Sequence, residues 1–145
     1  MVMRSTEMDL LDVLVGDWRV AMHEAWFLDQ PDVDDAGAAT IEWLGDAFLS
    51  FHWRAPVGDT RLVIGRSDAA DSYQALYHDE RGTSRVFAMT FDGSTWTMAR
   101  EDPDFHQRWT ATVRPGLIEG RWEASDDAGD TWRTDYRLVL APAPQ

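Results

Sequence analysis

The chain has 145 residues, 44% of them apolar, which is enough for one domain with a packed core. Its 26 acidic residues outnumber its 13 basic residues and give a net charge of -13, which repels nucleic-acid phosphates and anionic lipids, so we expect no nucleic acid and no membrane as partner. The sequence contains neither cysteine nor lysine, which excludes thiol nucleophiles, disulfides and lysine Schiff bases.

The first predicted element is a short helix over residues 5–15, in which Met8, Leu11 and Leu14 share one apolar face. Gly16 is expected to end this helix, as glycine often does just past a helix C-terminus. Residues 1–14 contain several charges and no long apolar run, so we expect neither a signal peptide nor a membrane span there. Together with the absence of cysteine, this favours a cytoplasmic protein.

From Asp17 onward, apolar and polar residues alternate with a period of two, and turn sequences recur at short intervals. Asp92-Gly93, between two alternating segments, is the strongest hairpin signal. Ten strands are predicted, at residues 17–28, 38–43, 47–54, 60–66, 73–78, 84–91, 95–101, 105–113, 117–125 and 131–140. Such a meander avoids exposed edges by closing on itself. We therefore predict an all-β fold, a single antiparallel ten-stranded barrel with the short N-terminal helix closing one end. The one domain spans residues 1–145, with flexible ends at residues 1–4 and 141–145.

The alternation also indicates which side chains point into the barrel. Apolar residues such as Val20, Phe87 and Met89 define inward faces, whereas residues 47–54 carry apolar side chains on both faces and leave the orientation open. The inward faces also include five polar residues: Glu24, Arg100, Gln107, Thr134 and Tyr136. Because buried polar groups need partners, these residues should meet each other, water or a polar ligand group. The alternative is a β-bulge that turns several of them outward.

A barrel with this many strands often encloses a cavity, and a mixed apolar and polar lining is typical of small-molecule sites. We predict a ligand-binding site in the interior. Its candidate residues are Glu24, Trp26, Trp43, His52, Tyr77, Met89, Met98, Arg100, Gln107, Trp109 and Tyr136.

An ordered set of short motifs extends over nearly the whole chain. The motifs are Leu14-Val15-Gly16-Asp17-Trp18, Ile41-Glu42-Trp43-Leu44, Phe48-Leu49 with Trp53, Tyr77-His78-Asp79-Glu80-Arg81-Gly82, Phe91-Asp92-Gly93 with Trp96, Pro103-Asp104-Phe105-His106-Gln107-Arg108-Trp109, Ile118-Glu119-Gly120-Arg121-Trp122-Glu123-Ala124-Ser125 and Gly129-Asp130-Thr131-Trp132. In these motifs the chain resembles the bacterial lipocalin-like family called domain of unknown function 1579, within the calycin superfamily of lipocalins and fatty-acid-binding proteins. The resemblance implies a calycin-like ten-stranded barrel with an interior cavity, and it implies no activity, because that family has none assigned.

The sequence departs from two ligand-binding patterns of the wider superfamily. Many fatty-acid-binding proteins hold the ligand carboxylate with an Arg-x-Tyr pair on the last strand, whereas here Arg133 and Tyr136 are three residues apart and should lie on opposite faces. Haem-binding relatives of the nitrobindin type use a histidine near the C-terminus, and no histidine follows His106. The departures argue against a fatty acid and against haem.

Other chemical motifs are missing. The four histidines lie on separate strands without metal-ligand spacing, and the acidic clusters do not match a calcium-binding EF-hand loop. No nucleophile elbow, phosphate-binding loop or dinucleotide fingerprint occurs. We therefore expect no metal and no cofactor.

Three functions remain open. The first is a non-enzymatic protein that binds a small hydrophobic molecule as its partner in the barrel interior. The second is a cavity enzyme of isomerase or cyclase type, in which Glu24 with Tyr136 or Arg100 would form an acid–base pair rather than a structural contact. The third is a filled barrel that serves as a structural or dimerisation module, with Leu76 and Phe27 in one exposed apolar patch and a homodimer as its product.

Overall fold

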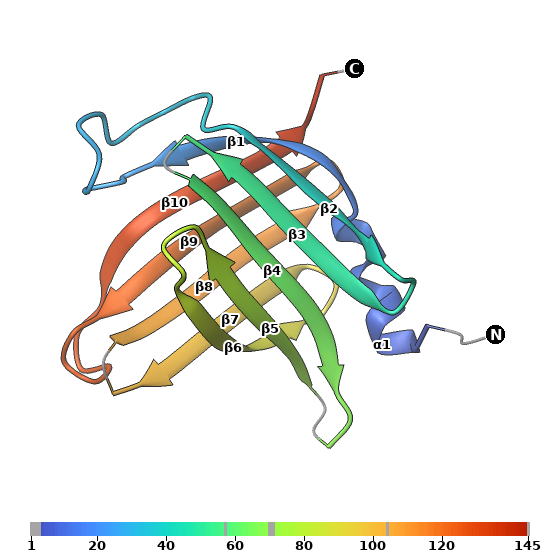
Figure 1. The fold of residues 1–145 in the computed structure, drawn as a ribbon. Helices are drawn as coiled ribbons and strands as arrows, with labels where there is room; N and C mark the ends of the chain where they lie inside the picture. The colour runs from blue at the N-terminus through green and yellow to red at the C-terminus, as the bar shows by residue number, and fades with distance from the viewer. Residues whose placement is uncertain (1–3, 57, 70–71, 104, 145) are drawn as a thin grey trace.

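The protein is described by a computed structural model that covers residues 4–56, 58–69, 72–103 and 105–144. The predicted all-β fold is confirmed, because ten antiparallel strands form one closed barrel in the order β1-β10-β9-β8-β7-β6-β5-β4-β3-β2. The strands are β1 (Gly16–His23), β2 (Ala38–Leu44), β3 (Phe48–Ala55), β4 (Gly58–Ser67), β5 (Ser72–Asp79), β6 (Ser84–Phe91), β7 (Thr95–Asp102), β8 (Phe105–Arg114), β9 (Leu117–Ser125) and β10 (Arg133–Pro142). Every strand pairs with its sequence neighbours, and β1 pairs with β10 to close the barrel (Figure 1).

The N-terminal helix covers one end of the barrel (Figure 1). It consists of α1 (Thr6–Asp9) and the 3-10 helix η1 (Leu10–Leu14), and the Ser5 hydroxyl caps it by accepting a hydrogen bond from the Met8 N–H at 3.1 Å. Met8, Leu11 and Leu14 are buried, as their spacing predicted. The helix ends at Leu14 with Val15 as its C-cap, and Gly16 follows at the next position and begins β1, so the prediction that Gly16 lies just past the end of the helix is confirmed.

The first strand is shorter than predicted, because β1 ends at His23 rather than at residue 28. Glu24 adopts a left-handed conformation with φ of 55°, which breaks the extended backbone. The chain then folds back along β1, where the backbones of Met22 and Val33 exchange hydrogen bonds. Glu24 is therefore exposed instead of inward, and Trp26 lies in the loop between β1 and β2.

A β-bulge in β10 also changes the predicted faces. Thr134 pairs with Glu123 of β9, whereas Tyr136 pairs with Trp122, so one extra residue, Asp135, lies between them. Tyr136 therefore shares the inward face of Trp122, and Thr134 shares the outward face of Glu123. The predicted inward position of Thr134 was wrong because sequence alternation cannot register this extra residue.

The half of the barrel next to the helix is filled by apolar side chains. In β3, whose orientation the sequence left open, Leu49, Phe51 and Trp53 are buried and His52 lies on the outer face. Three indoles pack against one another in the interior, edge to face for Trp96 and Trp109 with ring centroids 5.5 Å apart, and tilted for Trp109 and Trp122 with centroids 5.3 Å apart. This indole cluster needs a glycine beside it, because a Cβ on Gly120 would lie 2.1 Å from the Trp109 ring.

The C-terminal segment of the chain belongs partly to the barrel wall. β10 continues to Pro142, two residues beyond the predicted strand, and Ala141 pairs with Arg19 of β1. Of the ends expected to be flexible, residues 1–3 and 145 lie outside the described residues.

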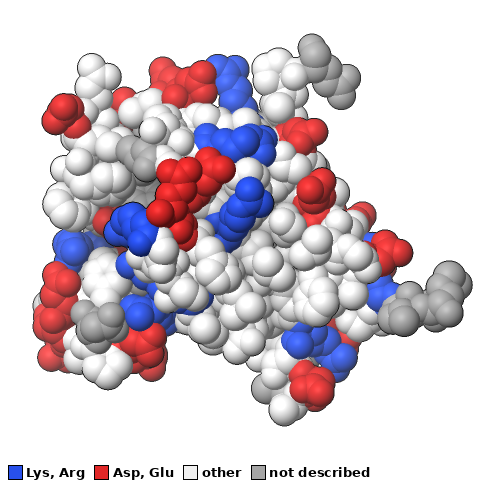
Figure 2. Space-filling view, viewed as in Figure 1, with Lys and Arg blue, Asp and Glu red and all other residues white. Residues whose placement is uncertain are grey.

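Charges of both signs are interspersed on the face seen in Figure 2. Across the described ranges, no helix has the length and apolar character required to cross a bilayer.

Candidate functional site

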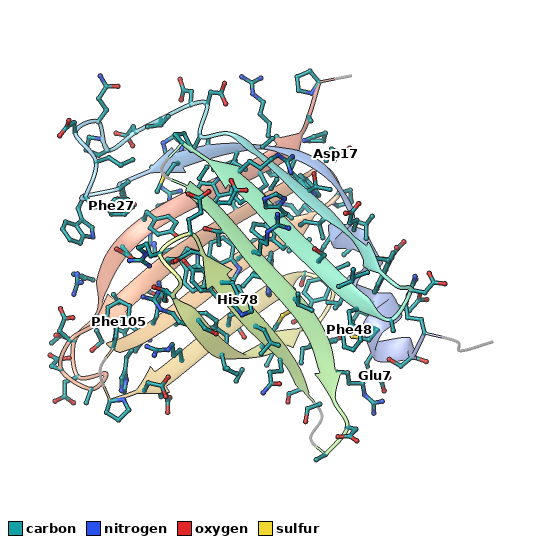
Figure 3. All side chains as sticks on the ribbon, in the orientation of Figure 1. Glu7, Asp17, Phe27, Phe48, His78 and Phe105 are labelled. Atoms are coloured by element: carbon teal, nitrogen blue, oxygen red, sulfur yellow. The ribbon has the colours of Figure 1, made fainter. Side chains whose placement is uncertain are left out.

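A large cavity opens at the end of the barrel opposite the helix, and we call it the mouth cavity. Its volume is about 470 Å³, within the range of small-molecule sites. Side chains from β1, β3, β4, β5, β6, β8 and β10 line it, together with residues of the loops after β1 and β5. In Figure 3, Phe27 and Phe105 mark this end, whereas Glu7 and Phe48 mark the end that carries the helix.

The mouth cavity ends on an aromatic floor. Below it is a floor cavity of only about 30 Å³, lined by apolar side chains such as Leu62, Met98 and Trp109. Trp53, Tyr77 and Tyr136 line both cavities and so separate them. Because the floor cavity is this small, the space for a ligand is short and lies almost wholly in the mouth.

Arg85 is a cation in the lining of the mouth cavity. It comes from β6, and its Nη1 donates a hydrogen bond to Gln107 Oε1 of β8 at 3.0 Å. Its guanidinium lies 5.5 Å from the Tyr77 ring centroid and 5.3 Å from that of Phe105. Two rings and a buried amide thus hold the Arg85 side chain in place. Strands β6 and β7 pair only from Ala88 onward, which leaves room for Arg85 to reach β8.

Asp79 organises the wall formed by β5 and the following turn. Its carboxylate accepts hydrogen bonds from the Tyr77 hydroxyl at 2.9 Å and from Arg81 Nη2 at 2.7 Å. Burial by itself would raise the pKa of Asp79, but these hydrogen bonds outweigh it and lower the pKa to about 2. The pKa of Tyr77 is raised, first by burial and then by its hydrogen bond to Asp79. The wall therefore presents a paired carboxylate and a neutral phenol.

Tyr136 is the second phenol of the site. Its ring meets the edge of Phe27 at a centroid distance of 5.7 Å. Burial raises its pKa, and the nearby Tyr77 and Asp135 raise it further, so the hydroxyl stays protonated at neutral pH. Among the described residues, nothing forms a hydrogen bond with the Tyr136 hydroxyl. It is a neutral donor that lines both cavities.

The bulge in β10 builds the rim of the mouth cavity. Because of the extra residue, Arg133, Asp135 and Tyr136 all line the cavity, so the expectation that Arg133 and Tyr136 lie on opposite faces was wrong. Arg133 nevertheless forms an ion pair with Asp126. Asp135 accepts a hydrogen bond from Trp26 Nε1 at 2.9 Å, which holds the exposed Trp26 over the rim.

The structure brings together six of the eleven candidate residues. Trp26, Tyr77, Gln107 and Tyr136 line the mouth cavity, and Met98 and Trp109 line the floor cavity beneath it.

The other five candidates lie elsewhere. Glu24 is outside the barrel, 3.8 Å from Arg137, and His52 is on the outer face, 2.8 Å from Asp59. Trp43 lies near the helix, where its Nε1 donates to Asp12. Arg100 pairs with Asp102 at the end of β7, and Met89 is packed in the core; neither lines the mouth or floor cavity.

The most important residue that the sequence analysis missed is Arg85. It is two positions before Phe87, whose inward direction was predicted, so the same alternation could have placed Arg85 inside. The same alternation, counted from the inward Tyr77, could also have placed Asp79 inside. Arg133 and Asp135 carried no such signal, because only the bulge puts both at the rim.

Residues that could hold a metal are not grouped in the described part of the chain, where no three His, Asp or Glu side chains converge. No protein-family model matches the chain, and no curated protein sequence matches it.

Proposed function

We propose that the protein binds a small molecule with an apolar body and a polar group in the mouth cavity. One observation carries this proposal: about 470 Å³ of space at the open end combines aromatic walls with polar side chains from β4, β5, β6, β8 and β10. A barrel built only as a scaffold would gain stability by filling that space with apolar side chains. The resemblance to the lipocalin-like family called domain of unknown function 1579 is compatible with this proposal and remains a hypothesis.

The two alternative functions find less support. The acid–base pair of a cavity enzyme required Glu24 beside Tyr136 or Arg100, but Glu24 is exposed and lies near Arg137 outside the barrel. A dimerisation module required Leu76 and Phe27 in one patch. Leu76 instead pairs with Val86 on the outer faces of β5 and β6, whereas Phe27 contacts Tyr136 at the mouth. A homodimer and a cytoplasmic location stay predictions.

Native mass spectrometry of the freshly purified protein tests the proposal, because a ligand held in the mouth cavity would add its mass to the chain. A second experiment fills the cavity with a larger side chain and compares the result with the same substitution outside it. Thr60 lines both cavities, so Thr60→Trp should remove the bound mass and abolish binding of an added aromatic compound, whereas Thr112→Trp on the exposed face of β8 should not. Equal binding by the wild type and a folded Thr60→Trp variant would contradict the proposal.

A further inference from the structure

Some of the charged side chains around the mouth cavity have a partner of opposite charge, and others do not. Asp79 is paired with Arg81 at 2.7 Å, and Asp59 with His52 at 2.8 Å. Arg133 forms an ion pair with Asp126, which lies outside the lining. Glu80 is exposed at the rim, where Asp135 accepts a hydrogen bond from Trp26 Nε1.

Arg85 differs from the other arginines of the lining because it forms no ion pair with the carboxylates of the described residues. Its hydrogen-bond partner is the neutral amide of Gln107, and its other neighbours are the rings of Tyr77 and Phe105. An amide orients the guanidinium and leaves its charge uncompensated. The hydrogen bond to Gln107 uses one of five N–H donors, so a fork of donors remains for a planar anion.

A second donor belongs to the same cavity. The Tyr136 hydroxyl is protonated and has no hydrogen-bond partner in the described residues. A carboxylate has two oxygen atoms, so it can accept from an arginine and from a phenol together. The negative charge of the chain as a whole would repel free anions, so a ligand acid needs a local cation such as Arg85 to bind here.

The shape of the space limits the rest of the ligand. The floor beneath the mouth cavity leaves only about 30 Å³, so an extended alkyl chain could not continue into the barrel interior. Its apolar walls are mainly rings, contributed by Trp26, Phe27, Trp53 and Phe105. Rings pack well against a flat apolar body, so a ligand of one or two fused aromatic rings fits better than a flexible chain.

We infer that the mouth cavity binds a compact aromatic acid, with its carboxylate on Arg85 and its rings against the aromatic walls. This inference rests on the proposed function and names the ligand class for the same cavity. Arg85 is the residue that determines specificity for an acid over a neutral compound of equal shape.

Isothermal titration calorimetry with 2-naphthoate and its neutral isostere 2-naphthamide tests the inference. The wild-type protein should bind 2-naphthoate about tenfold or more tightly than 2-naphthamide, as expected for a charge-assisted hydrogen bond. Arg85→Gln should remove this preference and leave the affinity for 2-naphthamide within about threefold of wild type. Arg85→Lys should keep part of the preference, because it keeps the charge.

Arg114→Gln is the matched control, because Arg114 has Glu119 as its ion-pair partner and lies outside the lining of the mouth cavity. It should leave the preference for 2-naphthoate within about threefold of wild type. Equal binding of both compounds by the wild type, or an unchanged preference in folded Arg85→Gln, overturns the aromatic acid and leaves the proposed binding function standing. If the wild type binds neither compound and carries no ligand in native mass spectrometry, the inference and the proposed function both fail.

Discussion

The two ends of the barrel are made from the same strands, yet they use inward positions differently. Next to the helix, these positions hold Trp96, Ile118 and Leu140, which are almost completely buried. At the mouth, the inward positions of β5, β6 and β8 hold Asp79, Arg85 and Gln107. One strand can therefore supply core packing at one end and polar groups of the cavity lining at the other. The packed core and the polar cavity lining are separated along the strands rather than between strands.

Trp96→Ala should produce the largest loss of stability. The Trp96 side chain is 2% exposed and packs against Trp109, and truncating such a residue costs about 3–5 kcal/mol. Urea unfolding followed by circular dichroism measures the change. A loss below about 1 kcal/mol would show that the closed end is not the stable half and would break the comparison.

Gly120→Ala should be the next most harmful change. Its new Cβ would lie 2.1 Å from the Trp109 ring, and overpacking of this kind costs about 1–3 kcal/mol. Gly65→Ala is the control, because its Cβ would meet only the ring of the exposed Phe48, at 3.0 Å. Urea midpoints of the two variants should differ clearly. Equal midpoints would mean that the cluster of Trp96, Trp109 and Trp122 is loosely packed.

Asp79→Asn should cost about 1–2 kcal/mol at pH 7, because hydrogen bonds to a charged group are lost. The pKa of Asp79 is lowered from 3.8 to about 2 in the folded protein, so its contribution is complete above about pH 4 and is lost as the pH falls through 2. Urea unfolding at several pH values should therefore show a weaker acid dependence for the variant. Asp126→Asn, which removes an exposed ion pair, should change stability by less than about 1 kcal/mol.

Trp26→Ala should have the smallest effect on stability, within about 1 kcal/mol, because the Trp26 side chain is 63% exposed. The same change should weaken binding of 2-naphthoate roughly threefold, since Trp26 lines the mouth cavity. Leu44→Ala, at an exposed apolar position far from the mouth cavity lining, should alter neither property. Calorimetry and urea unfolding of both variants would sharpen the contrast between the two ends.

The regular parts of the fold were predictable from the sequence. Alternation of apolar residues predicted ten strands and most inward faces, because a buried face fixes the register of a strand. The two errors in strand faces have local causes: the left-handed Glu24 ends β1 early, and the bulge at Asp135 shifts β10. Neither position carries the glycine that would signal such a conformation.

The candidate site was predictable only in part. Alternation identified Tyr77, Gln107 and Tyr136, which line the mouth cavity, but it also supplied Arg100, which does not. Alternation along one strand gives the direction of a side chain and says nothing about its height in the barrel. The height depends on the stagger between strands, which long-range pairing determines.

The pairing of β1 with β10 has a consequence for how the chain folds. Trp18 lies opposite Pro142, so this seam joins segments separated by almost the whole sequence. During synthesis, β1 must wait for residues 133–142 before its edge is covered, and until then it can pair with strands of other chains. Such non-local closure slows folding, because the loop entropy is lost before the contacts form. The same seam that leaves the finished barrel without a free edge makes the nascent chain prone to aggregation.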